Sequence, residues 1–173
     1  MAVREPDRAL NIVTRIDNMC GFFERREIIT AINSAVPHTG ILHGPGALGF
    51  DIPLFVGLGT VGLWAALDAF SERADPSKKK SMPDRFDARY IQGDEGRSLK
   101  ELDDLRNLYA HNYAGEADDE YFAHKPPRYV LLKRGDRVPL TCGAEFDGYR
   151  LHLELCHLRK YSQIVTRVLE RFR

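Results

Sequence analysis

Apolar residues recur at helical spacing in four stretches of the chain, at about 6–35, 53–73, 98–115 and from 156 to the C-terminus. A repeat of three to four residues places these side chains on one face of a helix, which is typical of helices that pack around a common core. The first stretch predicts one long or two consecutive helices, with Gly21 as a candidate interruption. The pattern as a whole predicts a mainly α fold.

Local signals delimit two of these helices. Asp51 can cap, and Pro53 can open, the second helix. Ser98 followed by Glu101 forms a capping-box pattern at the start of the third helix, and Gly115 suits its end. We therefore expect the third helix to be clearly bounded.

Two segments between the helices interrupt the helical pattern. Residues 37–53 are rich in glycine and proline, which favours a structured connection. Residues 74–97 are charged, contain proline and include Lys78, Lys79 and Lys80, so we expect a solvent-exposed loop. Both segments are expected within one domain covering 1–173, since this length suits a single core.

A β-like insertion is expected at 128–155, before the last helix. The apolar runs 129–132 and 138–140 flank a candidate turn at 134–136, and alternation over 151–155 predicts a third short strand. The predicted fold is thus a helical bundle with a small antiparallel hairpin or three-stranded insertion.

The charge balance excludes a strongly basic nucleic-acid binder. The chain has 25 Lys and Arg against 25 Asp and Glu, so any RNA contact must come from local clusters. Candidate RNA-backbone contacts are Lys78, Lys79, Lys80, Lys133 and Arg134. Such clusters are more often simply solvated surface.

Composition also favours a cytoplasmic protein. The three cysteines, Cys20, Cys142 and Cys156, lack the spacing of a zinc site and are expected to be reduced packing residues. The start of the chain has no apolar signal region. The uncharged stretch Ile52–Leu67 is shorter than the roughly 20 residues that a spanning helix needs, so we expect a buried core helix and no membrane contact.

The run RNLYAHNY, from Arg106 to Tyr113, carries the strongest candidate chemistry. Cleavage of RNA through its own 2′-hydroxyl needs a group that transfers protons near neutral pH, as His111 would, and a cation that stabilises the phosphate, as Arg106 would. Asn107 would orient His111 or bind the phosphate. This chemistry requires no metal and no cofactor. On residue types alone, a structural salt bridge for Arg106 and a surface position for His111 are favoured.

The same run resembles the R-X4-6-H motif of the HEPN superfamily. The resemblance implies a helical bundle that forms a homodimer, with Arg106, Asn107 and His111 in a composite, metal-independent endoribonuclease site for an RNA substrate. It also implies a role as a toxin or defence effector. About 140° separates Arg106 from His111 around an ideal helix, and a site shared between two chains would overcome that separation.

Tyr113 extends the resemblance to the R-X4-H-X-Y form of toxins paired with nucleotidyltransferase antitoxins. It would be a site of inactivating nucleotidylation, although core packing is an equal alternative. The alternative function for the chain is a non-catalytic HEPN-like module that binds a partner protein or a nucleotide.

The remaining motifs are weaker evidence for a functional site. Gly57, Gly59 and Gly62 match a dinucleotide-binding fingerprint if residues 52–56 form a strand, and Gly44, Gly46 and Gly49 repeat the spacing. We favour close helix packing, because no second parallel strand with a ribose-binding acid follows. His38 and His43 suit ordinary loop positions, while His152 and His157 are histidines that the fold can bring to the site.

Overall fold

The mainly helical fold is confirmed. The computed structural model describes residues 5–25, 52–74, 81–86, 91–111, 135–151 and 153–171. Within these ranges the helices are α1 (Glu5–Phe23), α3 (Ile52–Ala74), α4 (Met82–Arg85), α5 (Glu95–His111) and α7 (Leu155–Arg171). A two-stranded antiparallel sheet, β1 (Val138–Pro139) and β2 (Glu145–Phe146), precedes the last helix.

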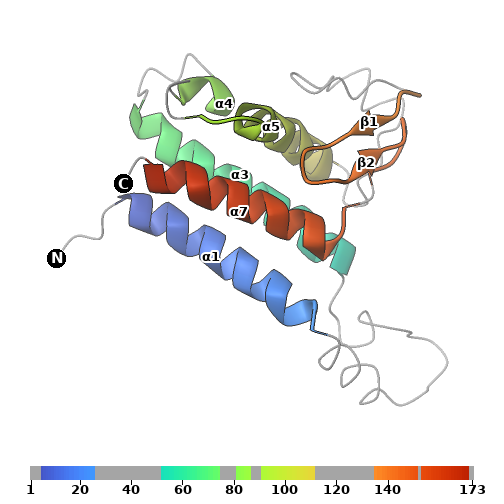
Figure 1. Ribbon diagram of the computed structural model, residues 1–173, viewed down its shortest axis with the longest axis horizontal. Helices are drawn as coiled ribbons and strands as arrows, with labels where there is room; N and C mark the ends of the chain where they lie inside the picture. The colour runs from blue at the N-terminus through green and yellow to red at the C-terminus, as the bar shows by residue number, and fades with distance from the viewer. Residues whose placement is uncertain are drawn as a thin grey trace.

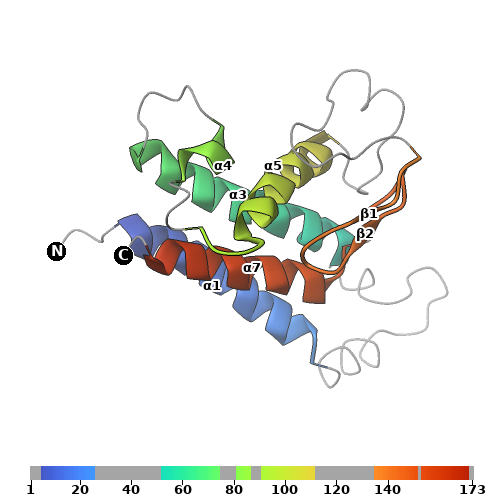
Figure 2. The same cartoon turned by 45° about the horizontal axis from the view of Figure 1, so that its top comes forward.

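Helix α3 is the centre of the bundle. It contacts α1, α4, α5 and α7, and Figures 1 and 2 show α1 and α7 side by side on one side of the bundle with α5 on the other. Among the described helices, the segment Leu54–Glu72 alone is long and apolar enough to cross a membrane. A core helix passes the same test, and the contacts of α3 on several sides fit that interpretation.

The three glycines at the start of α3 each face a different helix. A β-carbon on Gly57 would approach α5, one on Gly59 would approach α7, and one on Gly62 would approach α1. Their nearest atoms would be Tyr109 Cδ1 at 2.8 Å, Leu158 Cδ2 at 2.5 Å and Ile16 Cδ1 at 3.2 Å. Residues 52–56 are helical, so the dinucleotide-binding interpretation of this pattern is wrong and close helix packing is confirmed. The second glycine pattern, Gly44 to Gly49, lies outside the described residues.

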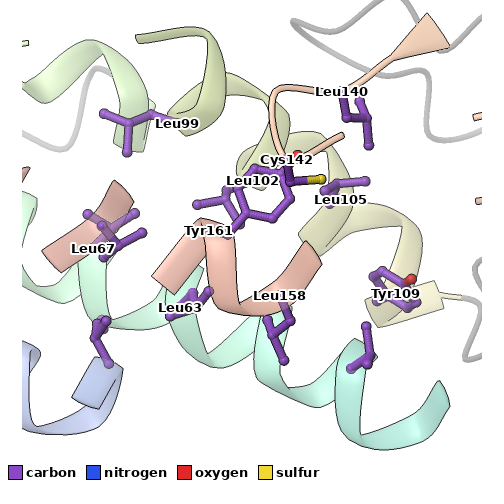
Figure 3. Packing of buried hydrophobic residues seen from close by; sticks show 14 of the residues in the cluster. Leu63, Leu67, Leu99, Leu102, Leu105, Tyr109, Leu140, Cys142, Leu158 and Tyr161 are labelled. Atoms are coloured by element: carbon purple, nitrogen blue, oxygen red, sulfur yellow. The ribbon is translucent and has the colours of Figure 1, made fainter. Parts of the chain in front are cut away.

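One hydrophobic core joins the helices and the hairpin. Figure 3 shows Tyr161 of α7 beside Leu102 of α5 and Cys142 of the turn between the strands. All three side chains are fully buried. The small sheet therefore belongs to the same core as the bundle.

A buried carboxylate fixes α5 to that sheet and to α7. Glu101 has no exposed surface and accepts hydrogen bonds from the Thr141 backbone N–H (3.1 and 3.0 Å), the Tyr161 hydroxyl (2.7 Å) and Arg97 Nε (3.0 Å). The Thr141 hydroxyl donates as well. These donors offset the cost of removing the charge from water, so the position of α5 depends on this network.

The capping-box interpretation of Ser98 and Glu101 is therefore wrong. Helix α5 begins three residues earlier, at Glu95, whose carboxylate accepts the Gln92 N–H at 2.9 Å. Ser98 lies inside the helix and donates to the Asp94 carbonyl. Hydrogen bonds from Arg171 lower the pKa of Glu95 and tie this end of α5 to α7.

Within the described residues the insertion contains a pairing that was not predicted. Strand β1 pairs with β2, Val138 opposite Phe146, across a turn at 140–144. The expected partner at 129–132 lies outside the described residues. The third strand is reduced to a single bridge from Leu151 to Phe146, since α7 already begins at Leu155.

Two connections also differ in detail from expectation. Gly21 does not interrupt α1, and α4 forms within the segment expected as a charged loop at 74–97. The part of the first predicted helix beyond residue 25 and the glycine-rich connection up to residue 51 lie outside the described residues.

The substitution Gly57→Ala is expected to lower the free energy of unfolding by about 1 kcal/mol. Its methyl group would overlap the Tyr109 ring, and overpacking of roughly 1 to 3 kcal/mol exceeds the helix-propensity gain of about 1 kcal/mol. Urea unfolding measures the change. Gly21→Ala is the control, because its nearest neighbour would be 3.6 Å away and propensity alone should stabilise it. Equal stabilisation of both variants would refute the close contact.

The substitution Glu101→Gln is expected to lower the free energy of unfolding by about 3 kcal/mol, because an amide group would face several hydrogen-bond donors in a site closed to water. Thermal unfolding followed by circular dichroism measures the loss. The exposed Glu170→Gln on α7 serves as the control and should stay within about 0.5 kcal/mol of the wild type. A loss below 1 kcal/mol would contradict the role assigned to the network.

Candidate functional site

The candidate motif occupies the last turns of α5. Arg106 and Asn107 are both half-buried, and His111 is the last residue of the helix. The side chain of His111 lies outside the described residues. So do Tyr113 and the candidate RNA contacts Lys78, Lys79, Lys80, Lys133 and Arg134, and all of these assignments stay predictions.

Arg106 rests on an aromatic ring rather than on a carboxylate. Its Cζ lies 3.9 Å from the centroid of the Trp64 ring on α3, and its Nε is buried without a hydrogen-bond partner. Within the described part of the chain no ion pair or hydrogen bond involves this side chain. The structural salt bridge considered from residue types alone thus finds no partner among the described residues.

The ring that carries Arg106 is itself anchored. Trp64 Nε1 donates to Oδ1 of Asp103 at 2.7 Å, and Asp103 is only 4% exposed. Asp103 precedes Arg106 by three residues, so both lie on neighbouring positions of one face of α5. At the contact between α3 and α5, the indole of Trp64 thus contacts both the buried Asp103 carboxylate and the Arg106 guanidinium.

Sequence reasoning missed Trp64 and Asp103. One signal was present, since Trp64 is the chain's only tryptophan and it lies among small residues on an apolar helix. Its partners are 39 and 42 positions further along the chain, at a separation that helical periodicity does not report. Contact between these positions follows only from the antiparallel packing of α3 against α5.

Beside Arg106 the surface is hollowed and apolar. A cavity of about 160 Å³ is lined by Leu54, Gly57, Leu58, Val61, Tyr109 and Ala110. Ala110 follows Arg106 by one helical turn, so the hollow and the guanidinium lie on the same side of α5. Burial raises the pKa of the Tyr109 phenol far above its usual range, which keeps this wall of the hollow uncharged.

Large apolar side chains continue from this hollow over the outer surface. Leu54 and Leu58 of α3 are 41% and 62% exposed, and Ile12, Met19 and Phe22 of α1 are also exposed. The Phe23 and Phe55 rings, 5.8 Å apart, and the approach of Ile16 to Gly62 place α1 antiparallel beside α3. We call the surface formed by these five exposed side chains the apolar face.

The cysteines and His157 lie apart from the motif in the sequence. Cys20 and Cys142 are buried as expected, and burial, helped by Glu24, raises the pKa of the Cys20 thiol to about 12. Cys156 is exposed, which corrects its expected packing role. Potential ligand atoms of Glu154, Cys156 and His157 lie within 4.8 Å of one another.

His157 already has a hydrogen-bonding role at the start of α7. Its Nδ1 accepts the backbone N–H of Glu154 at 3.1 Å, as a residue in a helix cap does. Burial lowers the pKa of its imidazole, which favours the neutral form that this hydrogen bond needs. His152 lies outside the described residues.

Comparison with protein-family models, curated proteins and solved structures finds no match to this chain. The chemistry of the motif and the surroundings of Arg106 are therefore the basis for assigning a function.

Proposed function

We propose that this protein is a metal-independent endoribonuclease of the HEPN type. The observation that carries the proposal is the guanidinium of Arg106, which is half-buried against Trp64 while no described carboxylate pairs with it. A cation held in this way, with no carboxylate partner among the described residues, suits the binding of a phosphate group. A merely structural arginine at a half-buried position is expected to have a carboxylate partner.

The reaction follows from the residue types in the motif. His111 would remove the proton from a ribose 2′-hydroxyl, and the resulting oxygen would attack the adjacent phosphorus. The bond from phosphorus to the 5′-oxygen breaks, leaving a 2′,3′-cyclic phosphate on one fragment and, after protonation, a 5′-hydroxyl on the other. Arg106 would stabilise the charge on the phosphate, and Asn107 would position it.

A shared site between two copies of the chain is part of the proposal. On an ideal helix, positions 106 and 111 are separated by about 140°, so one helix is not expected to bring both side chains to one phosphate. The apolar face and the hollow beside Arg106 support a second chain packing there, because burying exposed side chains such as Leu54 and Leu58 favours association. Assembly at this place would put two motifs close to the interface.

The apolar face also favours the second candidate function. A surface with five large exposed apolar residues on two adjacent helices suits a module that binds a partner protein without cutting RNA. The pairing with a nucleotidyltransferase antitoxin, modification of Tyr113 and a cytoplasmic location stay predictions from the sequence.

The substitutions Arg106→Ala and His111→Ala are expected to reduce RNA cleavage in EDTA by about a hundredfold or more, because each removes a group acting on the reacting phosphate. Gel analysis of labelled single-stranded RNA measures the rate and identifies the cyclic phosphate end. His157→Ala is the control histidine and should cleave as the wild type does. Full activity of His111→Ala would overturn the proposal, whereas intact RNA with purified wild type would favour the binding module.

The substitution Leu58→Glu is expected to convert a dimer into a monomer and to reduce cleavage in parallel, because a carboxylate on the apolar face opposes its burial. Analytical ultracentrifugation measures the mass. Tyr149→Glu, which places the same charge at an exposed position that is not part of the apolar face, should leave the dimer intact. A wild type that cleaves RNA as a monomer would refute the shared site.

Mixing the two inactive variants tests the shared site directly. If each site takes Arg106 from one chain and His111 from the other, a heterodimer of Arg106→Ala with His111→Ala keeps one intact site. Random exchange of subunits would then restore about a quarter of wild-type activity.

A further inference from the structure

We infer that Trp64 and Asp103 are a positioning pair that holds the Arg106 guanidinium ready to receive a phosphate group of RNA. The inference rests on the proposed function and adds to it two residues that the motif does not contain. It is drawn from the contact of Arg106 Cζ with the Trp64 ring at 3.9 Å and the hydrogen bond from Trp64 Nε1 to Asp103 at 2.7 Å.

Asp103 and Arg106 carry opposite charges at neighbouring positions of α5. Asp103 and Arg106 are separated by one helical turn, a spacing at which opposite charges commonly pair. Here the Asp103 carboxylate accepts the indole N–H of Trp64, and no ion pair with Arg106 is present within the described part of the chain. The carboxylate still offsets the positive charge nearby, yet it leaves the guanidinium donors unoccupied. A direct ion pair would have used the donors that a phosphate needs.

The indole ring of Trp64 attracts the Arg106 guanidinium. A cation is attracted to the electron-rich face of an indole, and the attraction is stronger when water is excluded. A hydrogen bond to a carboxylate polarises the indole and increases the electron density of that face. Because Asp103 is almost completely buried, this hydrogen bond is protected from water. Asp103 therefore strengthens the contact between Trp64 and Arg106 without forming an ion pair with Arg106.

Stacking on Trp64 also restricts the conformational freedom of the Arg106 side chain. An arginine side chain loses conformational freedom when it is fixed on a ligand, which weakens binding. Stacking on Trp64 fixes the guanidinium before the ligand arrives, and the buried Nε shows that this part of the side chain is already withdrawn from solvent. Only the phosphate then remains to be placed. The pair thus acts through Arg106 and is distinct from the residues proposed to touch the substrate.

The test measures binding and cleavage separately. The probe for binding is a short 2′-O-methyl oligoribonucleotide, which has the phosphates of RNA and cannot be cleaved through a 2′-hydroxyl. Trp64 is the chain's only tryptophan, so its fluorescence reports directly on the ring that carries Arg106. We expect this fluorescence to change when the wild type is saturated with the probe, and to stay unchanged in Arg106→Ala at the same probe concentration.

The variants separate positioning from stability. Asp103→Leu removes the acceptor and is expected to weaken binding of the probe about tenfold, the loss of a partly desolvated cation–π contact. Asp103→Asn retains an acceptor oxygen for the indole N–H and should bind within about threefold of the wild type. Val56→Ala, a cavity at another buried position of α3, lowers stability without contacting Arg106 and should bind as the wild type does.

Two outcomes would overturn the inference: binding by Asp103→Leu equal to that of the wild type, or no binding of the probe and no fluorescence change in the wild type. The fate of the proposed function is read from a different measurement. If the expected losses of binding are found but the wild type leaves unmodified RNA intact, the ribonuclease proposal fails and the positioning pair stands as part of an RNA-binding site.

Discussion

A carboxylate without exposed surface must be surrounded by donors, and Glu101 imposes this requirement on three parts of the fold at once. Its oxygens accept from Thr141 in the hairpin turn, from Tyr161 on α7 and from Arg97 on α5 itself. If these donors did not surround the carboxylate, its charge would be buried in the core without partners. The short sheet and the last helix are therefore placed relative to α5 by one side chain.

The last turns of α5 are held against α3 by a steric constraint instead of a charge. Gly57 has no side chain, and the space is filled by the Tyr109 ring. The same contact continues about two turns further along α3, where Trp64 meets Arg106 and Asp103, which precede Tyr109 on α5. Helix α5 is thus held between a polar network and a tight aromatic contact. The candidate motif lies at the C-terminal end of α5, and these two contacts determine the position of that helix.

Sequence periodicity predicted α1, α5 and α7 well because each of them buries one apolar face, and that requirement is local. It failed where one pattern has two physical explanations. Ser98 and Glu101 have the spacing of a capping box, but the same spacing lets both side chains reach Thr141 from inside a helix. The turn at 140–144 was not predicted for a related reason. The apolar residues around 140–144 pack into the core and do not look like a turn.

The candidate site was predictable only in part, because Arg106 belongs to a contiguous motif while its environment does not. Nothing local in the sequence connects Trp64 with Asp103, yet their contact decides what Arg106 can do. If Asp103 paired directly with Arg106, the two charges would neutralise each other and the position would be structural. In the proposed site the carboxylate is engaged by the indole, so charge balance would be kept while the guanidinium would remain able to bind an anion. The indole between them is thus what separates a stabilising ion pair from a potential phosphate site.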